Sequence, residues 1–250
     1  MDQRWGTLVI VVMIVSMIIG AFGGMAENSI RRVLGYQMLN GMPFILVMMA
    51  FTTHDPQRAL GAGILYTIHH MLTVGSLILA SGAIEETYGT GLLSKLSGLA
   101  RRDPIIAWIF AAGAFSVVGF PPFSGMWGKV LIVVEIARTG DLWAWIVIAV
   151  IIIASFAAFL SMLRVWREVF WGKDLPKEKV PAELIIRKKL MAPSAALIMG
   201  SLTMFILAGP VIDVTMHAAE DLLDTEAYTQ AVLGDAPVAL PDIDSIQGGR

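Results

Sequence analysis

The stretch Gly119-Phe120-Pro121-Pro122-Phe123-Ser124-Gly125-Met126-Trp127-Gly128-Lys129 decides how this chain folds. It lies inside an apolar run over residues 105–136, which is too long for one simple membrane helix. Two consecutive prolines remove two backbone donors, and the flanking glycines permit irregular backbone. Non-helical backbone at membrane depth is stable only where protein or water surrounds it. The sequence therefore predicts a broken membrane helix, with the break at Gly119, Pro121, Pro122 and Gly125.

Lys129 ends this stretch and is the only Lys or Arg in any apolar segment of the chain. A lysine at the centre of a membrane helix costs about 3 kcal/mol on insertion scales, which makes it a functional-site candidate. The alternative is a side chain that extends to the membrane surface, but the predicted depth of Lys129 leaves it short of that surface. A broken helix that carries a buried cation indicates an ion pathway.

The composition sets the class of protein. Of the 250 residues, 56% are hydrophobic and only 15% are charged, whereas soluble domains carry about 25% charged residues. We therefore predict an all-α polytopic membrane protein in the lipid bilayer. A net charge of −2 without a basic stripe argues against nucleic acid as a partner. The chain has no cysteine, no metal-ligand spacing and no phosphate loop, so we expect no metal and no cofactor.

Six apolar segments predict about six transmembrane helices, the fourth of them discontinuous. They run over about 6–24, 33–51, 59–84, 104–137, 142–163 and 190–212. The first is expected to remain as a span, because it has no clear signal-peptide cleavage site. Residues 1–170 would form a membrane domain of five spans, and 171–189 a basic loop. Residues 213–250 form an acidic tail, expected to be mobile beyond a short helix near 217–223.

The distribution of cations predicts the orientation. Thirteen Lys and Arg residues fall on one side of the predicted spans, while Arg4, Arg58, Arg138 and Arg250 fall on the other. Because cytoplasmic loops carry the excess of Lys and Arg, the basic loop would be cytoplasmic and both termini extracytoplasmic. The expected location is the plasma membrane, or the inner membrane of a cell that has two.

His70 lies at the same predicted depth as Lys129. His70 is about eleven residues into the third span and Lys129 about nine residues into the fourth, or roughly 16 and 13 Å at 1.5 Å per residue. Histidine titrates near neutral pH, so this pair could relay protons. The alternative for His70 is a satisfied interhelical donor. His69 points to another face and is expected to be structural.

Three further polar side chains are weaker candidates for a proton pathway. Gln37 and Asn40 in the second span could line a water path, although amides also join membrane helices by hydrogen bonds. Glu135 could belong to the pathway, but an acid at the membrane interface is the simpler interpretation.

Three stretches resemble the antiporter-like proton-channel subunits. Residues 28–36 resemble the opening of their tenth helix. His69-His70-Met71, followed by residues 81–85, resembles their eleventh helix, and residues 118–129 resemble their broken twelfth helix. The match is closest to the D subunit of Mrp-type multisubunit cation/proton antiporters and covers about residues 7–170. Relatives occur in respiratory complex I and in membrane-bound hydrogenases.

The resemblance implies a fold with fourteen helices, of which this chain carries the second five-helix repeat and the last helix. By resemblance, residues 1–170 form a proton half-channel, Lys129 is its terminal lysine and His70 is the histidine that feeds it. The implied function is that of a subunit of an Na⁺(K⁺)/H⁺ antiporter, a transporter rather than an enzyme. The implied partners are protons, Na⁺ or K⁺, and other membrane subunits.

Departures from the family pattern leave other hypotheses open. The first repeat is absent, so another chain supplies it, or the protein is a truncated or non-conducting descendant. The second lysine expected one turn after the histidine is replaced by Val74, and the polar site of the tenth helix falls near Asn40 and Gly41. Two rival functions are a proton-translocating subunit of complex I or a hydrogenase, and a structural membrane subunit that conducts nothing.

Overall fold

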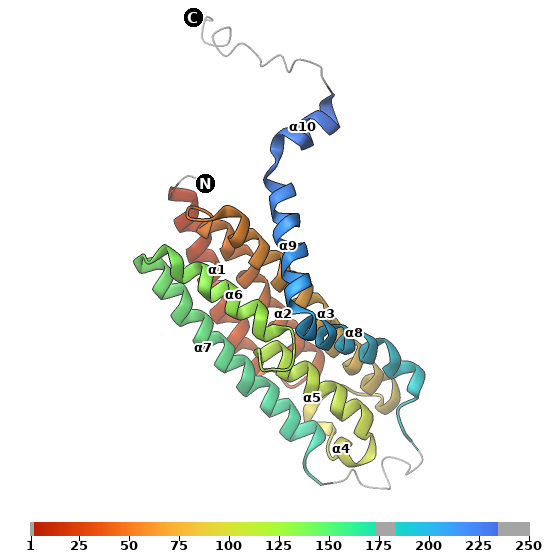
Figure 1. The fold of residues 1–250 in the computed structure, drawn as a ribbon. Helices are drawn as coiled ribbons and strands as arrows, with labels where there is room; N and C mark the ends of the chain where they lie inside the picture. The colour runs from red at the N-terminus through yellow and green to blue at the C-terminus, as the bar shows by residue number, and fades with distance from the viewer. Residues whose placement is uncertain (1–2, 174–183, 235–250) are drawn as a thin grey trace, which may run out of the picture.

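The computed structural model describes residues 3–173 and 184–234, and the regular elements of that part are helices (Figure 1). Ser29 and Leu92 form an isolated antiparallel bridge. The helices are α1 Gln3–Ala26, α2 Ile30–Leu46, α3 Pro56–Tyr88, α4 Leu99–Arg102, α5 Pro104–Val118, α6 Gly125–Thr139, α7 Leu142–Val165, α8 Lys188–Ile206, α9 Ala208–Leu223 and α10 Thr225–Leu233. Short 3-10 helices cover Val47–Phe51 and Leu93–Lys95, and a π-helical turn covers Trp166–Phe170.

Within the described residues, five helical segments are long and apolar enough to cross a membrane: Arg4–Ala26, Ile30–Phe51, Pro56–Tyr88, Leu142–Phe170 and Lys188–Ile206. The predicted fourth span is the pair α5 and α6, which follow one another along the bundle (Figure 1). The prediction of an all-helical membrane protein with a discontinuous fourth span is therefore confirmed.

Local sequence signals explain where these helices begin and end. Asp55 precedes α3 and accepts a hydrogen bond from the backbone N–H of Arg58 at 3.0 Å. Asp141 caps α7 in the same way, because its Oδ1 accepts from the Ala144 N–H at 2.7 Å. Gly89 and Gly140 end α3 and α6 with φ of 68° and 69°, a conformation that favours glycine.

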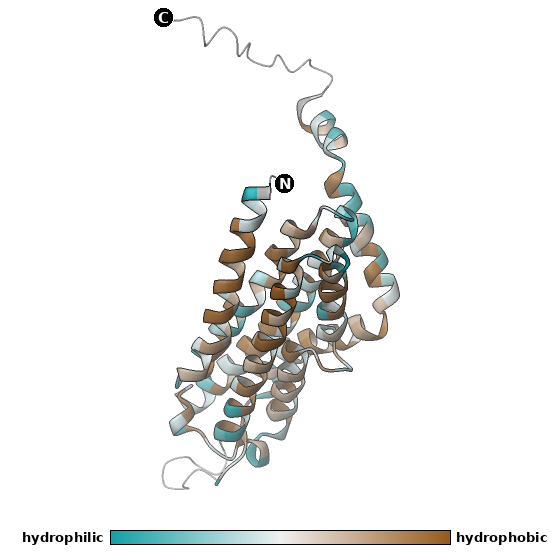
Figure 2. Ribbon diagram, turned by 90° about the vertical axis from the view of Figure 1, so that its left-hand side faces the viewer, coloured by the Kyte–Doolittle hydropathy of each residue, from teal (hydrophilic) through white to brown (hydrophobic). Residues whose placement is uncertain are grey.

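The long helix α3 is the central element, because α2, α5, α6, α8 and α9 all pack against it. One apolar cluster surrounds Leu77 and Phe110 toward the C-terminal end of α3. A second surrounds Phe44 and Ile136 toward the other end. Figure 2 shows apolar residues along the middle of the bundle and more polar residues at its lower end and in the last helices. The polar groups of the site lie between the two clusters.

The predicted C-terminal end of the last span, 190–212, is wrong. Helix α8 ends at Ile206, and α9 begins at Ala208 after a break at Leu207. Pro210 has no N–H to bond the carbonyl of Ile206, and its ring clashes with that carbonyl, so a straight helix stops there. Beyond the break, α9 packs against the start of α3 and leads the chain toward α10 (Figure 1).

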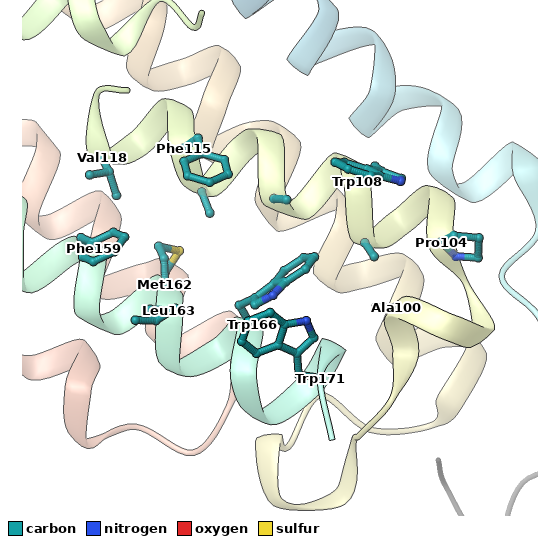
Figure 3. A pocket seen from close by; sticks show the side chains of 13 residues that line it. Ala100, Pro104, Trp108, Phe115, Val118, Phe159, Met162, Leu163, Trp166 and Trp171 are labelled. Atoms are coloured by element: carbon teal, nitrogen blue, oxygen red, sulfur yellow. The ribbon is translucent and has the colours of Figure 1, made fainter. Parts of the chain in front are cut away.

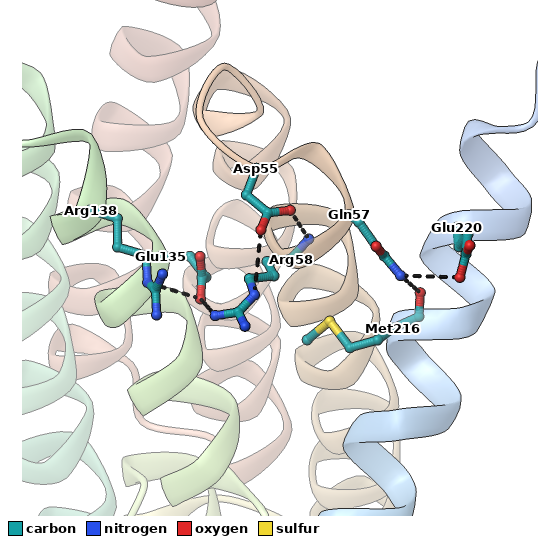
Figure 4. Close-up of polar contacts among 7 residues, drawn as sticks. All are labelled: Asp55, Gln57, Arg58, Glu135, Arg138, Met216 and Glu220. Carbon is teal, nitrogen blue, oxygen red and sulfur yellow. Dashed lines mark hydrogen bonds and ion pairs between the residues drawn. The ribbon is translucent and has the colours of Figure 1, made fainter.

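The tail also differs from the prediction. Helix α9 extends to Leu223, and α10 follows over Thr225–Leu233, although the sequence predicted a mobile tail with one short helix. Gln57 of α3 fixes α9 in place, because its Nε2 donates to the Met216 carbonyl at 3.1 Å and to Glu220 at 3.3 Å (Figure 4). Residues 235–250 and most of the predicted basic loop, 174–183, lie outside the described residues.

An apolar groove of about 550 Å³ runs between α5 and α7. Its walls carry Trp108, Phe115, Phe159, Trp166 and Trp171 (Figure 3). A large aromatic side chain such as Trp108, which is 76% exposed, is compatible with contact to lipid or to another membrane helix. The groove holds none of the predicted site residues.

Candidate functional site

The helix break forms as the sequence predicts. Helix α5 ends at Val118, Gly119 follows with φ of 98°, and α6 begins at Gly125. A methyl group at Gly125 would lie 2.0 Å from the Ser116 carbonyl oxygen and 2.8 Å from Cε1 of His69. Only glycine therefore lets α6 begin this close to α5 and α3. Two prolines, Pro121 and Pro122, fill the turn between the two helices.

Lys129 lies one turn into α6, and its side chain points back to the break. Its Nζ donates to the Val118 carbonyl and to the Ser155 hydroxyl, each at 2.8 Å. Val118 is the last residue of α5, so the ammonium lies at the negative end of that helix dipole. It also lies 5.4 Å from the centroid of the Phe44 ring, within cation–π range. An ammonium has three donors, and these contacts use two of them.

His70 is buried in the same part of the bundle, where α3 meets α2. A methyl group at Gly41 would lie 2.0 Å from Cε1 of His70, so the two helices are in close contact here. Tyr66 stacks between His70 and Phe44, with ring centroids 6.0 and 5.3 Å away. The same stack of rings connects His70 to Lys129, whose ammonium lies against Phe44, although no direct hydrogen bond joins the two residues among the described contacts. The structure therefore brings the two predicted residues together.

Gln37 and Asn40 are both buried in α2, as a polar lining requires. The side-chain nitrogen and oxygen of Gln37, Oδ1 of Asn40 and Nε2 of His70 have no protein partner among the described residues. A buried polar atom without a partner costs about 1–3 kcal/mol, and buried water commonly satisfies such atoms. The hydrogen bond to another helix, offered by the sequence as the alternative for Gln37, is not among the described contacts.

Glu135 lies at the other end of α6, in an ion-pair cluster. Its Oε1 is 3.5 Å from Nε of Arg138 and 3.9 Å from Nη1 of Arg58 (Figure 4). Arg58 also pairs with Asp55 at 3.4 Å. The carboxylate itself is 7% exposed, whereas the arginine side chains are about half exposed. The cluster ties the start of α3 to the end of α6.

The structure also reveals a ring of hydrogen bonds that the sequence analysis missed. His69 Nδ1 and four hydroxyls connect in the order His69, Ser124, Ser201, Ser116, Thr73 and back to His69, with distances of 2.8, 2.7, 2.9, 2.8 and 3.3 Å. All five side chains are at most 1% exposed. The spacing of His69, Thr73 and Ser76 on one face of α3 is the sequence signal that could have indicated it.

The comparisons with known proteins show the family of the chain. The model of the family "NADH:quinone oxidoreductase/Mrp antiporter, TM" matches residues 1–160. The chain belongs to this family. It is 32% identical to the D subunit of the Na(+)/H(+) antiporter of Bacillus subtilis over 218 residues, which are 87% of this chain and 43% of that protein.

Two solved structures resemble the fold. A chain of the Mrp complex from Dietzia sp. DQ12-45-1b superposes with a TM-score of 0.82 and 31% identity, over 93% of this chain and 50% of that one. A chain of respiratory complex I from Thermus thermophilus gives a TM-score of 0.60 at 21% identity, over 83% of this chain and 45% of that one. This second likeness concerns the fold alone. The chain thus spans about half the length of the relatives that it matches.

Proposed function

We propose that this protein is a membrane subunit of a multisubunit Na⁺(K⁺)/H⁺ antiporter and forms a proton half-channel. The observation that supports this most directly is the position of Lys129, a cation held by the last carbonyl of α5 and the Ser155 hydroxyl at a break in a membrane helix. A buried cation at interrupted backbone is typical of ion pathways. The family relationship supports the same class of function.

In the proposed mechanism, Lys129 exchanges protons with His70 through water. The ammonium gives one proton to a water molecule, which gives one of its own to Nε2 of the neutral imidazole. The amine and the imidazolium are the products, and the reverse steps restore the starting state. The unpartnered polar atoms of Gln37, Asn40 and His70 support a hydrated connection here. A charge change in a neighbouring subunit would drive the exchange, because charges in a low dielectric interact strongly.

The half-channel corresponds to residues 1–170, and Glu135 is its proposed outer end. The chain would lie in the plasma or inner membrane with both termini outside the cytoplasm and residues 171–189 inside. It would act as a transporter subunit, and other membrane subunits, including one that supplies the first repeat, are the proposed partners. Genes for small antiporter subunits beside this gene would agree with the proposal. Quinone or nickel–iron subunits there would favour a proton pump of the complex I or hydrogenase type.

One observation favours a non-conducting structural subunit. Val74, at the place where the resemblance leads us to expect a second lysine, is buried in an apolar cluster. The two hypotheses differ in what they require of Lys129, because a subunit that only packs against its neighbours has no need of a group that releases its proton.

Two substitutions at Lys129 test the proposal in everted membrane vesicles that contain the complete set of subunits. Lys129→Ala removes the proton-exchanging group, and we expect antiport to be lost while the assembled complex still co-purifies in mild detergent. Lys129→Arg keeps the positive charge, but a guanidinium does not release its proton in proteins. We therefore expect it to be inactive as well. Full antiport in both variants would support the structural subunit.

A further inference from the structure

Polar side chains follow the seam between α3 and α8, on a face of α3 that His70 does not occupy. His69, Thr73 and Ser76 are four and three residues apart, so they share one face of α3. Ser194 and Ser201 are seven residues apart and share one face of α8. All five of these side chains are buried. The helix packing therefore places a line of hydroxyls between the two helices.

The inner end of this line is the ring that contains His69. Each of its four hydroxyls contacts two partners, and both partners belong to the ring. A hydroxyl donates one proton, and an imidazole nitrogen either donates a proton or accepts one. When Nδ1 is an acceptor, the hydroxyls can all donate in sequence toward it, from Thr73 to Ser124; when Nδ1 is protonated, it donates to Ser124 and the sequence points the other way. The direction of the hydroxyls therefore depends on which nitrogen of His69 is protonated. Such a chain can shift a proton from one end to the other.

The next polar group along the seam is the pair Ser76 and Ser194. The Ser76 hydroxyl donates to the Ser194 carbonyl at 2.8 Å, and the Ser194 hydroxyl donates to the Ser76 carbonyl at 2.7 Å. The two hydroxyl oxygens lie 3.1 Å apart. Ser76 is three residues from Thr73, a rise of about 4.5 Å along the helix. A single water molecule can bridge a gap of this size.

The outer end of the line is a charged cleft of about 670 Å³ at the C-terminal end of α3. Arg31, Glu85, Glu86 and Lys189 line it, and Arg31 pairs with Glu85 at 2.6 Å. Pro193, directly before Ser194, is also part of its wall. The cleft thus approaches the serine pair from the end of the bundle that carries most of the cations.

We propose that the seam between α3 and α8 is a second proton route, leading from the charged cleft to the helix break. The inference rests on the proposed function, because Lys129 is the group that this route would serve. It gives the last transmembrane helix a part in transport, although the matched family model ends at residue 160. The inner exit of the route is Nε2 of His69, which is buried without a protein partner and would lie 3.1 Å from a methyl group at Gly125.

The proton balance of this route needs only water and one proton from the charged cleft. At the start, Nδ1 of His69 is an acceptor and Nε2 carries the ring proton. A water molecule at Ser76 gives a proton to the Thr73 hydroxyl and takes up the proton that arrives from the cleft. Thr73 passes its own proton to Ser116, and the shift continues through Ser201 and Ser124 to Nδ1 of His69. Nε2 then releases a proton to water at the break, and that water protonates the neutral amine of Lys129. One proton has moved, and each hydroxyl keeps one proton but has reversed its direction.

The test measures antiport per assembled complex in vesicles with the complete set of subunits. Ser201→Ala opens the ring, and we expect the rate to fall by about tenfold or more, because neighbouring hydroxyls lose their partner. The pair variant Ser76→Ala/Ser194→Ala should produce a similar loss. Ser201→Thr keeps the hydroxyl and should restore at least about half of the rate. Ser161→Ala is the matched control, since it removes a buried hydroxyl of α7 without a described partner.

The outcomes separate this inference from the proposed function. The inference is supported if both hydroxyl-removing variants are slow while Ser201→Thr keeps at least about half of the rate and Ser161→Ala transports at the wild-type rate. It is overturned if either hydroxyl-removing variant transports at the wild-type rate. It is also overturned if Ser201→Thr is as slow as Ser201→Ala, because the serine would then matter for packing. An inactive wild-type complex, or an active Lys129→Ala variant, would contradict the proposed function instead.

Discussion

Two faces of the same helix carry the polar groups of this protein in opposite ways. On the face of α3 toward α2, His70 lies near Gln37 and Asn40, and several of their polar atoms have no protein partner. On the face toward α8, every hydroxyl around His69 is paired with another side chain. The polar atoms of the first arrangement need water, whereas the hydroxyls of the second are satisfied by one another and only Nε2 of His69 lacks a protein partner. Adjacent histidines can therefore serve different purposes, because a helix turns by about 100° per residue.

The strongest test of this contrast compares the two histidines directly. His70→Gln keeps a polar side chain but removes the group that exchanges protons with Lys129. We expect antiport in vesicles to fall by about a hundredfold, within the range that proton-transferring side chains contribute. His69→Gln should lower the rate by about tenfold only, because the proposed water path on the His70 face of α3 remains intact. A larger loss of antiport rate in His69→Gln than in His70→Gln would mean that the main proton route runs along the face of α3 toward α8.

The second test asks whether the close contact of α2 and α3 holds His70 in place. Gly41→Ala would put a methyl group 2.0 Å from Cε1 of the imidazole, so the side chain must move. We expect destabilisation of about 1–3 kcal/mol, typical of overpacking, and a corresponding fall in the unfolding temperature in detergent.

Gly35 is the matched control on the same helix. Nothing lies within 4 Å of a methyl group there, and alanine is the better helix former. Gly35→Ala should therefore leave both the unfolding temperature and the antiport rate unchanged or slightly raised. Equal behaviour of the two variants would show that the packing around His70 is looser than the structure indicates.

The parts of the site that were predictable depend on local chemistry. Two prolines between glycines cannot continue a helix, so the break was visible in the sequence. Lys129 could be identified because a lysine in an apolar segment has a high free energy of membrane insertion. His70 was placed at the same depth by counting residues from the ends of the predicted spans. Pro210 carried the signal for the end of α8 at Ile206, which the hydropathy pattern obscured.

The spacing of His69 and Thr73 indicates a polar face of α3, but the complete ring could not be predicted, because its members come from three helices and the break. Ser116 and Ser201 are isolated hydroxyls among apolar residues, a pattern that also fits surface positions or bonds to the preceding turn. Their meeting depends on how α5 and α8 pack on α3, which no local pattern encodes. Helix α10 was missed because its acidic, polar sequence resembles a disordered tail.

The third test concerns Glu135, which contacts two arginines and is the proposed outer end of the half-channel. Because the arginine side chains are about half exposed, we expect the ion pairs to stabilise the protein by less than about 1 kcal/mol. Glu135→Gln should therefore change the unfolding temperature only slightly. If Glu135 is the outer proton group, antiport should nevertheless fall by about tenfold, since an amide cannot take up a proton at this position.

Arg138→Gln separates this role from a purely structural one. It removes the 3.5 Å ion pair but leaves the Glu135 carboxylate in place, so it should lower stability about as much as Glu135→Gln. If Glu135 carries protons, Arg138→Gln should retain most of the antiport activity. If Glu135 is only an acid at the membrane interface, both substitutions should have equal and small effects on transport. In that case the water path would leave the bundle elsewhere, and the hydrated face of α3 would end before the ion-pair cluster.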